Sequence, residues 1–314
     1  MEKNSKLPRD IFLDQIHAAA RNNKNIYVMT ADLGSDALDR FRAEMGRQFI
    51  HAGISEQNMI DVAAGMALNG KIVYVYAMAP FVTLRCFEQI KVAIASMGLP
   101  LTIIGVGVGY SYEDAGPTHY ATEDISCMRS LAGIEILTPG DEQSVIQAAR
   151  LTFAKPALRY IRLDRTYLPT LYNEGDNRFM QDGIAEIDRG ETLCIMTAGY
   201  MLQKARAVKV RLESDGIKPG IIDVFRLKPI NGQVLRSVLA PYSKVVTLEE
   251  HFLSGGLGGA LVEAMVDNGI RKDIKRIGIE DHYYCENGGR NYLHQLAGID
   301  VDTVTDAVRS FAKL

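Results

Sequence analysis

Short apolar runs alternate with segments of helical periodicity along the first half of the chain. Strand-like runs lie at 26–30, 72–76, 101–106, 135–138 and 157–163. Apolar residues at helical spacing predict helices over 11–20, 59–68, 84–96 and 142–153. Strands that are separated by helices pair in parallel through right-handed crossovers, so this half predicts an α/β domain with helices on both faces of its sheet.

A polar, turn-rich segment interrupts the alternation at 166–188, and the same alternation then resumes. Strands are predicted over 193–197, 221–224, 245–248 and 274–279. Helices are predicted over 201–214, 257–266 and 304–312. We therefore predict two three-layer, parallel-sheet α/β domains, at 1–165 and 189–314, which are joined by a linker over 166–188.

Composition and charge exclude several classes of function. The chain has 35 Lys and Arg against 38 Asp and Glu, a net charge of −3, so no basic footprint indicates nucleic acid or a membrane surface. The longest apolar candidate, 99–109, is far shorter than the roughly 20 residues that a membrane span needs. The first residues contain no apolar leader segment, so we expect a cytoplasmic protein with no membrane partner.

Cysteines, histidines and glycines predict no metal site or nucleotide site. The 4 cysteines share no C-x-x-C spacing, which favours buried free thiols in a reducing compartment. The 6 histidines show no ligand spacing, so we expect no metal ligands in this chain. The G-x-G-x-G run at 105–109 lacks the third spaced glycine of a dinucleotide fingerprint, which disfavours a dehydrogenase.

One carboxylate, Glu56, stands at the start of a helix whose body, 59–68, is almost entirely small or apolar. Such a helix is buried. Glu56 is therefore either a charge partner for the helix N-terminus or a functional carboxylate in a dry environment.

The motifs around Glu56 indicate its role more specifically than its position at the start of a helix does. G-I-S-E-Q-N-M at 53–59, followed by A-A-G-M-A at 63–67, resembles the pyrimidine-binding domain of thiamine-diphosphate enzymes of the transketolase group. Further pieces resemble the same family in the same order: A-D-L at 31–33, F-V at 81–82, D-A-G-P-T-H at 114–119, L-T-P-G-D at 137–141 and R-Y-I-R at 159–162. In the second half, R-L-K-P-I at 226–230 and E-E-H at 249–251, with G-G-L-G at 255–258, resemble the transketolase C-terminal domain.

The resemblance implies thiamine diphosphate as cofactor and assigns residues to its pyrimidine half. Glu56 would hydrogen-bond N1′ of the aminopyrimidine and favour its imino form, which requires a carboxyl that can share a proton. Phe81 would stack on the pyrimidine face; the alternative is ordinary core packing. Ile54 and Met78 would line the same site. Asp32 would face the cofactor from a neighbouring chain, or else cap a turn.

The resemblance also assigns substrate contacts. His119 would hydrogen-bond the reacting oxygens of a sugar, unless it is a loop histidine that the backbone satisfies. Asp114 would contact a sugar hydroxyl. Arg162 would pair with a distal anion or hydroxyl of the substrate, or form an ion pair with Asp164 or Glu123.

One family element has no counterpart in this sequence. Related enzymes hold the cofactor diphosphate through Mg²⁺ on a domain that is marked by G-D-G and a later Asn, and this chain has no G-D-G. The resemblance therefore implies the C-terminal subunit of a two-chain transketolase that transfers a two-carbon ketol unit from a ketose to an aldose-type acceptor. An N-terminal subunit would hold the Mg²⁺, and this chain would self-associate within a heterotetramer of two copies of each chain.

Other enzymes of the same cofactor stay open as alternatives. These are a deoxyxylulose-phosphate-synthase-like enzyme and the β chain of a 2-oxoacid dehydrogenase. P-T-H at 117–119 favours ketol transfer, since the dehydrogenase β chain typically reads G-x-x-H-S there. The run at 105–109 lacks the histidine that transketolases use for a sugar phosphate, so the sequence leaves the donor, the acceptor and their phosphorylation open.

Overall fold

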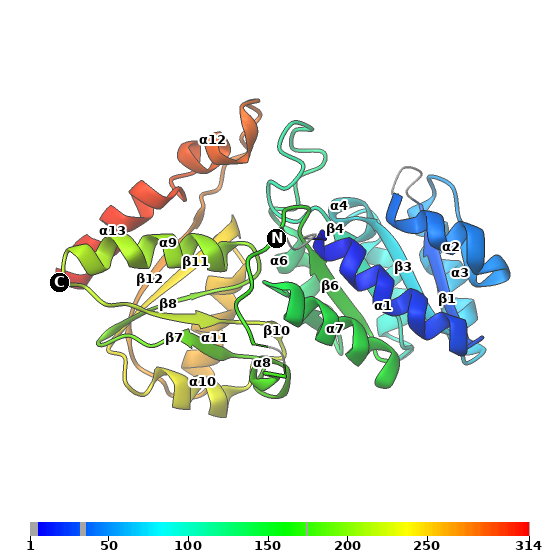
Figure 1. Ribbon diagram of the computed structural model, residues 1–314, viewed down its shortest axis with the longest axis horizontal. Helices are drawn as coiled ribbons and strands as arrows, with labels where there is room; N and C mark the ends of the chain where they lie inside the picture. The colour runs from blue at the N-terminus through cyan, green and yellow to red at the C-terminus, as the bar shows by residue number, and fades with distance from the viewer. Residues whose placement is uncertain (1–5, 32–35, 174, 314) are drawn as a thin grey trace, which may run out of the picture.

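The computed structural model describes residues 6–31, 36–173 and 175–313. Two α/β domains lie side by side, with the first half of the chain in one and most of the second half in the other (Figure 1). Both are built on mostly parallel sheets. The predicted fold class is therefore confirmed.

The sheet of the first domain has seven strands in the order β10-β5-β6-β4-β3-β1-β2. Six of them come from the first half of the chain: β1 Ile26–Thr30, β2 Phe49–His51, β3 Ile72–Met78, β4 Thr102–Val106, β5 Glu135–Leu137 and β6 Arg159–Leu163. These six pair in parallel. The seventh, β10 Arg226–Lys228, belongs to the second half of the chain and runs antiparallel to β5.

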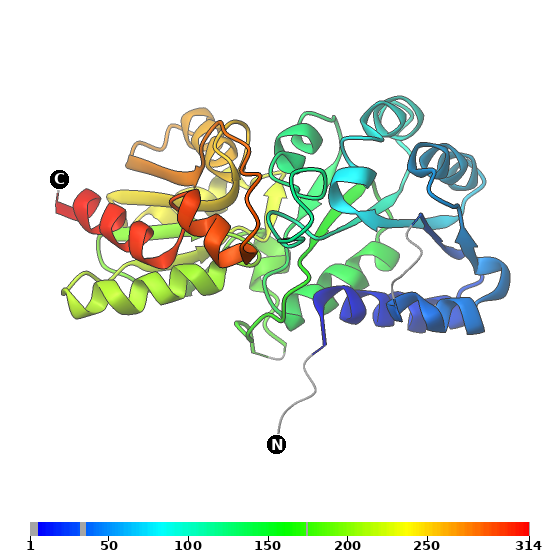
Figure 2. The ribbon, with the colours of Figure 1, turned by 90° about the horizontal axis from the view of Figure 1, so that it is seen from above.

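Successive side chains of the strands point alternately into two apolar layers, one on each face of the sheet. Val73 and Val75 of β3 pack with α3 Glu56–Leu68 on one face. Tyr74 and Tyr76 face the opposite layer. That layer is formed by α1 Pro8–Asn22, η1 Asp36–Leu38, α2 Asp39–Glu44 and α7 Glu142–Ala154, and helices accordingly cover both sides of the sheet (Figure 2). The two-residue period of a strand is what divides the side chains in this way.

The face with α3 also holds several short helices. They are α4 Ala79–Val82, α5 Phe87–Gln89, a π-helical segment Ile90–Ala95 and α6 Asp124–Arg129. The single helix predicted over 84–96 is therefore wrong in detail. It is replaced by α5 and a π-helical segment, in which the backbone hydrogen bonds span five residues rather than four.

The second domain has a five-stranded sheet in the order β12-β11-β8-β9-β7. Its strands are β7 Ala185–Asp188, β8 Leu193–Thr197, β9 Gly220–Asp223, β11 Lys244–Phe252 and β12 Asp273–Ile279. Its helices are α9 Met201–Ser214, α10 Gly232–Leu239, α11 Leu257–Asp267, α12 Gly289–Leu296 and α13 Val301–Lys313. All pairs are parallel except that of β7 with β9.

The predicted linker differs from the structure in its C-terminal part. Within 166–188 the chain forms α8 Arg178–Asp182 and then β7, which adds an antiparallel edge to the second sheet. Polar side chains are compatible with such a strand because an edge strand is only partly covered. The second domain thus begins within the segment that composition marks as a linker.

Strand β10 joins the two domains. Arg226 lies opposite Leu137, and Lys228 lies opposite Ile136 in the ladder with β5. The Lys228 ammonium also donates to the carbonyl of Arg129 at 2.7 Å. The domain interface therefore includes backbone pairing as well as side-chain contacts.

Four free cysteines are present, of which Cys86 and Cys194 are buried and Cys127 is partly buried. Cys285 is exposed, so the expectation of burial is wrong for that residue. Within the described ranges, no helix combines the length and the apolar character that crossing a bilayer requires.

Candidate active site

The candidate site lies where the parallel strands of the first domain end. Glu56 is the first residue of α3, and α4 follows β3 without a gap. A loop over 107–121, here called the substrate loop, follows β4. Carboxyl ends of parallel strands share one edge of a sheet, and ligands of open α/β sheets bind at that edge.

A buried carboxylate, a guanidinium and an aromatic ring form the first part of the site. The Glu56 side chain is only 5% exposed, and Arg85 Nη1 donates to its Oε2 at 2.8 Å. The Arg85 guanidinium lies over the Phe81 ring, 4.2 Å from the centroid, in a cation–π contact. The N-terminus of α3 also favours the negative charge of Glu56.

The substrate loop brings His119 to the same cluster. The rings of Phe81 and His119 meet edge to face with their centroids 5.2 Å apart. Thr118 Oγ1 is 2.9 Å from His119 Nδ1, which leaves Nε2 as the ring nitrogen outside that hydrogen bond. The structure therefore brings together Glu56, Phe81 and His119, which lie 63 positions apart at their extremes in the sequence.

The substrate loop is closed at its neck. Gly109 and Ala121 exchange two backbone hydrogen bonds of 3.1 and 3.0 Å. Gly107 has a positive φ of 82°, and a Cβ there would come 2.0 Å from the Tyr112 ring, so only glycine fits. Asp114 is exposed on the loop and lines a cleft of about 430 Å³ together with Tyr112 and Arg165.

Arg162 makes a contact that differs from both pairings expected from the sequence. It forms a two-pronged ion pair with Asp124, with Nε and Nη2 at 2.7 and 3.0 Å from the carboxylate oxygens. Pairing with Asp164 or Glu123 is therefore wrong. Burial opposes ionisation of Asp124, but the Arg162 guanidinium outweighs it and holds the pKa of that carboxyl below its usual value.

A different arginine lies at the rim of the cleft. Arg165 is exposed just after β6, and its guanidinium stacks on the Tyr112 ring at 4.0 Å from the centroid. Its backbone N–H donates to Ser111 Oγ at 3.1 Å. The resemblance did not include Arg165, because the motif R-Y-I-R ends three residues earlier, at Arg162.

Two of the three remaining predicted cofactor residues lie near the same edge. Ile54 stands two residues before α3 with 74% of its surface exposed. Met78 ends β3 and is half-buried. Asp32 lies outside the described residues.

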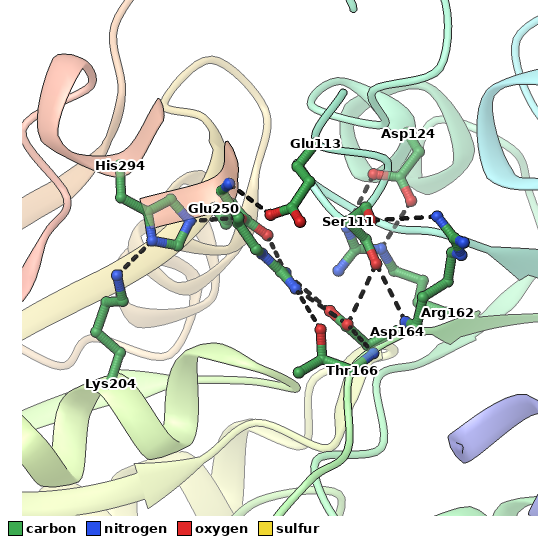
Figure 3. A network of polar contacts seen from close by, with 11 residues as sticks. Ser111, Glu113, Asp124, Arg162, Asp164, Thr166, Lys204, Glu250 and His294 are labelled. Atoms are coloured by element: carbon green, nitrogen blue, oxygen red, sulfur yellow. Dashed lines mark hydrogen bonds and ion pairs between the residues drawn. The ribbon is translucent and has the colours of Figure 1, made fainter. Parts of the chain in front are cut away.

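A buried polar network joins the site to the second domain (Figure 3). Arg290 of α12 donates to Asp164 at 2.8 and 3.0 Å and to Glu250 of β11 at 2.8 Å. His294 bonds to the same Glu250, and Lys204 of α9 bonds to His294. Arg290 thus lies between the carboxylates of Asp164 and Glu250, and His294 lies between Glu250 and Lys204.

Burial and pairing act in opposite directions on the pKa values of this network. Burial disfavours the Glu250 carboxylate, but Arg290 and His294 outweigh it and hold the pKa of Glu250 well below its usual value. Burial lowers the pKa of Lys204 to about 8. Of these residues only Glu250 lies in a quoted motif, E-E-H at 249–251, and its partners come from separate elements.

Metal ligands do not cluster in the part of the chain that the structure describes: no group of three or more His, Cys, Asp or Glu there is arranged to hold an ion.

Both halves of the chain match known family models. The model described as transketolase, pyrimidine binding domain, matches residues 8–170, and that of the transketolase C-terminal domain matches residues 183–304. The chain belongs to the transketolase family. Members of this family depend on thiamine diphosphate, and the resemblance inferred from the motifs is confirmed.

Relatives of similar length are named as transketolase subunits. The chain is 30% identical to an apulose-4-phosphate transketolase subunit of Phocaeicola vulgatus, over the whole of both chains. It is also 30% identical to a 6-deoxy-6-sulfo-D-fructose transketolase subunit of a Clostridium species, over 95% of this chain and 92% of that protein. For a 1-deoxy-D-xylulose-5-phosphate synthase of Syntrophus aciditrophicus the identity is 29%, but only 47% of that protein is covered.

Solved structures give the same fold. A split-gene transketolase described as an inactive β4 tetramer superposes with a TM-score of 0.85 at 27% identity, covering 98% of both chains. The transketolase of Campylobacter jejuni superposes with a TM-score of 0.81 at 16% identity, with 98% of this chain and 47% of that protein covered.

Proposed function

We propose that this chain is the C-terminal subunit of a two-chain, cytoplasmic transketolase that transfers a two-carbon ketol unit from a ketose to an aldose-type acceptor. The observation that carries the proposal is the cluster of Glu56, Phe81 and His119 at the carboxyl edge of the first sheet. Full-length relatives named as transketolase subunits support it.

The residues present fit the aminopyrimidine half of thiamine diphosphate. A buried carboxylate and a half-buried aromatic face, joined through Arg85, offer a hydrogen-bond acceptor and a stacking surface within one cluster. Glu56 and Phe81 would hold the ring, with Ile54, Met78 and Asp32 around it. When bound, the cofactor supplies the nucleophilic carbon and the electron sink for ketol transfer.

His119 and the cleft would bind the sugar. His119 would donate a hydrogen bond to the carbonyl oxygen of the ketose, which becomes an alkoxide during transfer. Asp114 would accept from a sugar hydroxyl. A distal anion on the sugar would meet Arg165 at the rim, because the guanidinium of Arg162 is already neutralised by Asp124.

The proposal includes a partner chain. An N-terminal subunit would hold Mg²⁺ and the cofactor diphosphate, with two copies of each chain in a heterotetramer. The solved split-gene chain that is described as an inactive β4 tetramer supports self-association of this subunit type and its dependence on a partner.

Reconstitution tests the proposal. The purified chain should bind thiamine diphosphate weakly and turn over no sugar, and addition of an N-terminal transketolase subunit should produce ketol transfer from ketoses to aldoses, measured by chromatography of both products. Tight, Mg²⁺-dependent cofactor binding by this chain alone, measured by calorimetry, would overturn the partner requirement. Release of CO₂ from pyruvate by the pair, without ketol transfer, would favour the two alternatives, a deoxyxylulose-phosphate-synthase-like enzyme or a 2-oxoacid dehydrogenase β chain.

A further inference from the structure

The substrate loop belongs to the first domain but rests on the second. Its neck lies directly against β11: a Cβ on Gly109 would come within 2.0 Å of Glu250 Oε2. Beside the neck, the rings of Tyr110 and Tyr120 pack edge to face at 4.9 Å, and Tyr110 lies 6.2 Å from the His294 ring of α12.

Further along the loop, one carboxylate reaches the second domain. Glu113 Oε2 accepts a hydrogen bond of 2.6 Å from the backbone N–H of Arg290, at the start of α12 (Figure 3). Tyr120 Oη donates to the Glu113 carbonyl at 3.1 Å, so the backbone of the loop is held at the same residue. An N–H in the first turn of a helix has no partner inside the helix, so this donor is available to the loop.

Arg290 is itself fixed from both sides. Its side chain is 6% exposed and pairs with Asp164, which follows the last strand of the first half, and with Glu250 of β11. Its guanidinium also stacks on Tyr200 at 3.6 Å from the ring centroid. A side chain held by two carboxylates and a ring cannot move without leaving buried charges unpaired, so its backbone N–H is a fixed point for Glu113.

We propose that Glu113 and Arg290 are positioning residues: through them the C-terminal domain holds the substrate loop in its sugar-binding position. Asp114 is the next residue along the chain, and the cleft is lined by Glu113, Asp114 and Arg290 together. Loss of the tether lets the loop sample other positions, and the sugar must then order it on binding. The C-terminal domain thereby contributes to sugar affinity without supplying a catalytic residue; this role rests on the proposed function.

Loop mobility gives a test that does not depend on activity. Glu113 is exposed, so Glu113→Ala should leave the fold intact. Hydrogen–deuterium exchange on the full chain should show faster exchange of loop peptides and of the first turn of α12 in Glu113→Ala. Glu113→Gln, whose amide oxygen can still accept from Arg290, should restore most of the protection. Glu286→Ala removes an exposed carboxylate in the segment just before α12 and should change nothing. Unchanged loop exchange in Glu113→Ala overturns the proposal.

Kinetics on the reconstituted pair provide the second readout. Glu113→Ala should raise KM for the sugar by about tenfold while kcat and cofactor affinity stay within about twofold, because the cost of ordering the loop falls on both the bound sugar and the transition state. Equal loss of kcat and of the folded fraction, without a change in KM, would indicate a purely structural role and contradict the proposal. If the pair shows no ketol transfer, the proposed function fails, and exchange alone decides the role of the tether.

Discussion

Glu56 is buried, whereas the side chain that it hydrogen-bonds is partly exposed. Its side chain is almost fully buried at the first position of α3, and its hydrogen-bonding partner Arg85 is 42% exposed. A ligand could replace the exposed guanidinium of Arg85 as the hydrogen-bonding partner of the buried Glu56 carboxylate. This residue is therefore the first one to alter.

Glu56→Gln should reduce ketol transfer in the reconstituted pair by about 10²-fold or more, because an amide cannot share a proton with the pyrimidine ring. The measurement is turnover together with the exchange rate of the cofactor C2 proton by NMR. Circular dichroism of the backbone should show the same fold. Normal C2 proton exchange in Glu56→Gln would contradict the role.

His119→Ala should lower kcat by roughly 10²–10³-fold with little change in cofactor affinity, since a positioned donor to a developing alkoxide acts mainly in the transition state. Steady-state kinetics and calorimetric titration of the cofactor measure the two effects. His282→Ala, which removes an exposed histidine of the second domain, is the matched control. Full turnover in His119→Ala would remove the main support for ketol transfer.

Asp223 gives a prediction on pH. Burial raises the pKa of Asp223 from 3.8 to about 8, and its one described hydrogen bond comes from Tyr172 Oη at 2.7 Å. A carboxyl whose pKa is raised by folding stabilises the protein below its unfolded pKa, and that contribution is lost as the pH rises towards 8. Asp223→Asn cannot titrate, so its stability relative to wild type should improve by up to about 1.4 kcal/mol per pH unit in this window.

Urea unfolding at pH 5.5 and pH 8 measures the difference. Asp267→Asn, at an exposed position, should show no such pH dependence. A constant offset between Asp223→Asn and wild type at both pH values would show that Asp223 does not titrate in this range.

Local motifs explain which site residues the sequence could reveal. Glu56 and His119 each lie in a short motif whose neighbouring residues resemble those of the transketolase group. Arg85 was out of reach, because it lies between α4 and α5 and outside the quoted motifs. Arg290 and Glu113 were also out of reach, since their pairing depends on how α12 docks across the domain boundary, which no spacing in the sequence indicates.

At the scale of elements, the glycine-rich start of α11 provides backbone hydrogen bonds to the buried carboxylate of Glu249. Glu249 accepts hydrogen bonds from the backbone N–H groups of Leu257 and Gly258 at 2.6 and 2.9 Å. Burial raises the pKa of Glu249 to about 7, although these two N–H groups oppose the shift. A Cβ on Gly256 would come 2.0 Å from Glu249 Oε2, so glycine at this position allows the start of α11 to approach the carboxylate closely.

Gly256→Ala should therefore lower the free energy of unfolding by about 1–3 kcal/mol through overpacking. Gly259→Ala is the matched control: a Cβ there meets nothing closer than 3.8 Å, and alanine favours the helix by up to about 1 kcal/mol. Denaturant midpoints of the two variants should move in opposite directions. A shift of the same sign and size in both would exclude the close contact as the cause.

The elements that the sequence predicted are those with a strong internal period. Long helices such as α1, α7 and α9 and the buried strands appear where apolar spacing placed them. The three-residue strands β2 and β10 were missed because neither lies in an apolar run of its own, whereas the equally short β5 does. The polar β7 was missed because an edge strand does not need an apolar pattern.

At the scale of the whole molecule, β10 decides whether the halves can fold separately. The first family match ends at 170, well before β10. A fragment of residues 1–170 would leave one side of β5 without its partner, and such an edge is a template for association. We expect this fragment to aggregate in size-exclusion chromatography at concentrations where the full chain is dispersed; a monomeric, cooperatively unfolding fragment would contradict this.

The exchange of β10 across the domain boundary also limits how this molecule can be recombined. Joining the first half of one relative to the second half of another at the apparent boundary would pair β5 with a foreign strand, and would separate Lys228 from the carbonyl of Arg129 that it contacts. The ladder between β5 and β10 is preserved only when both halves come from the same parent protein.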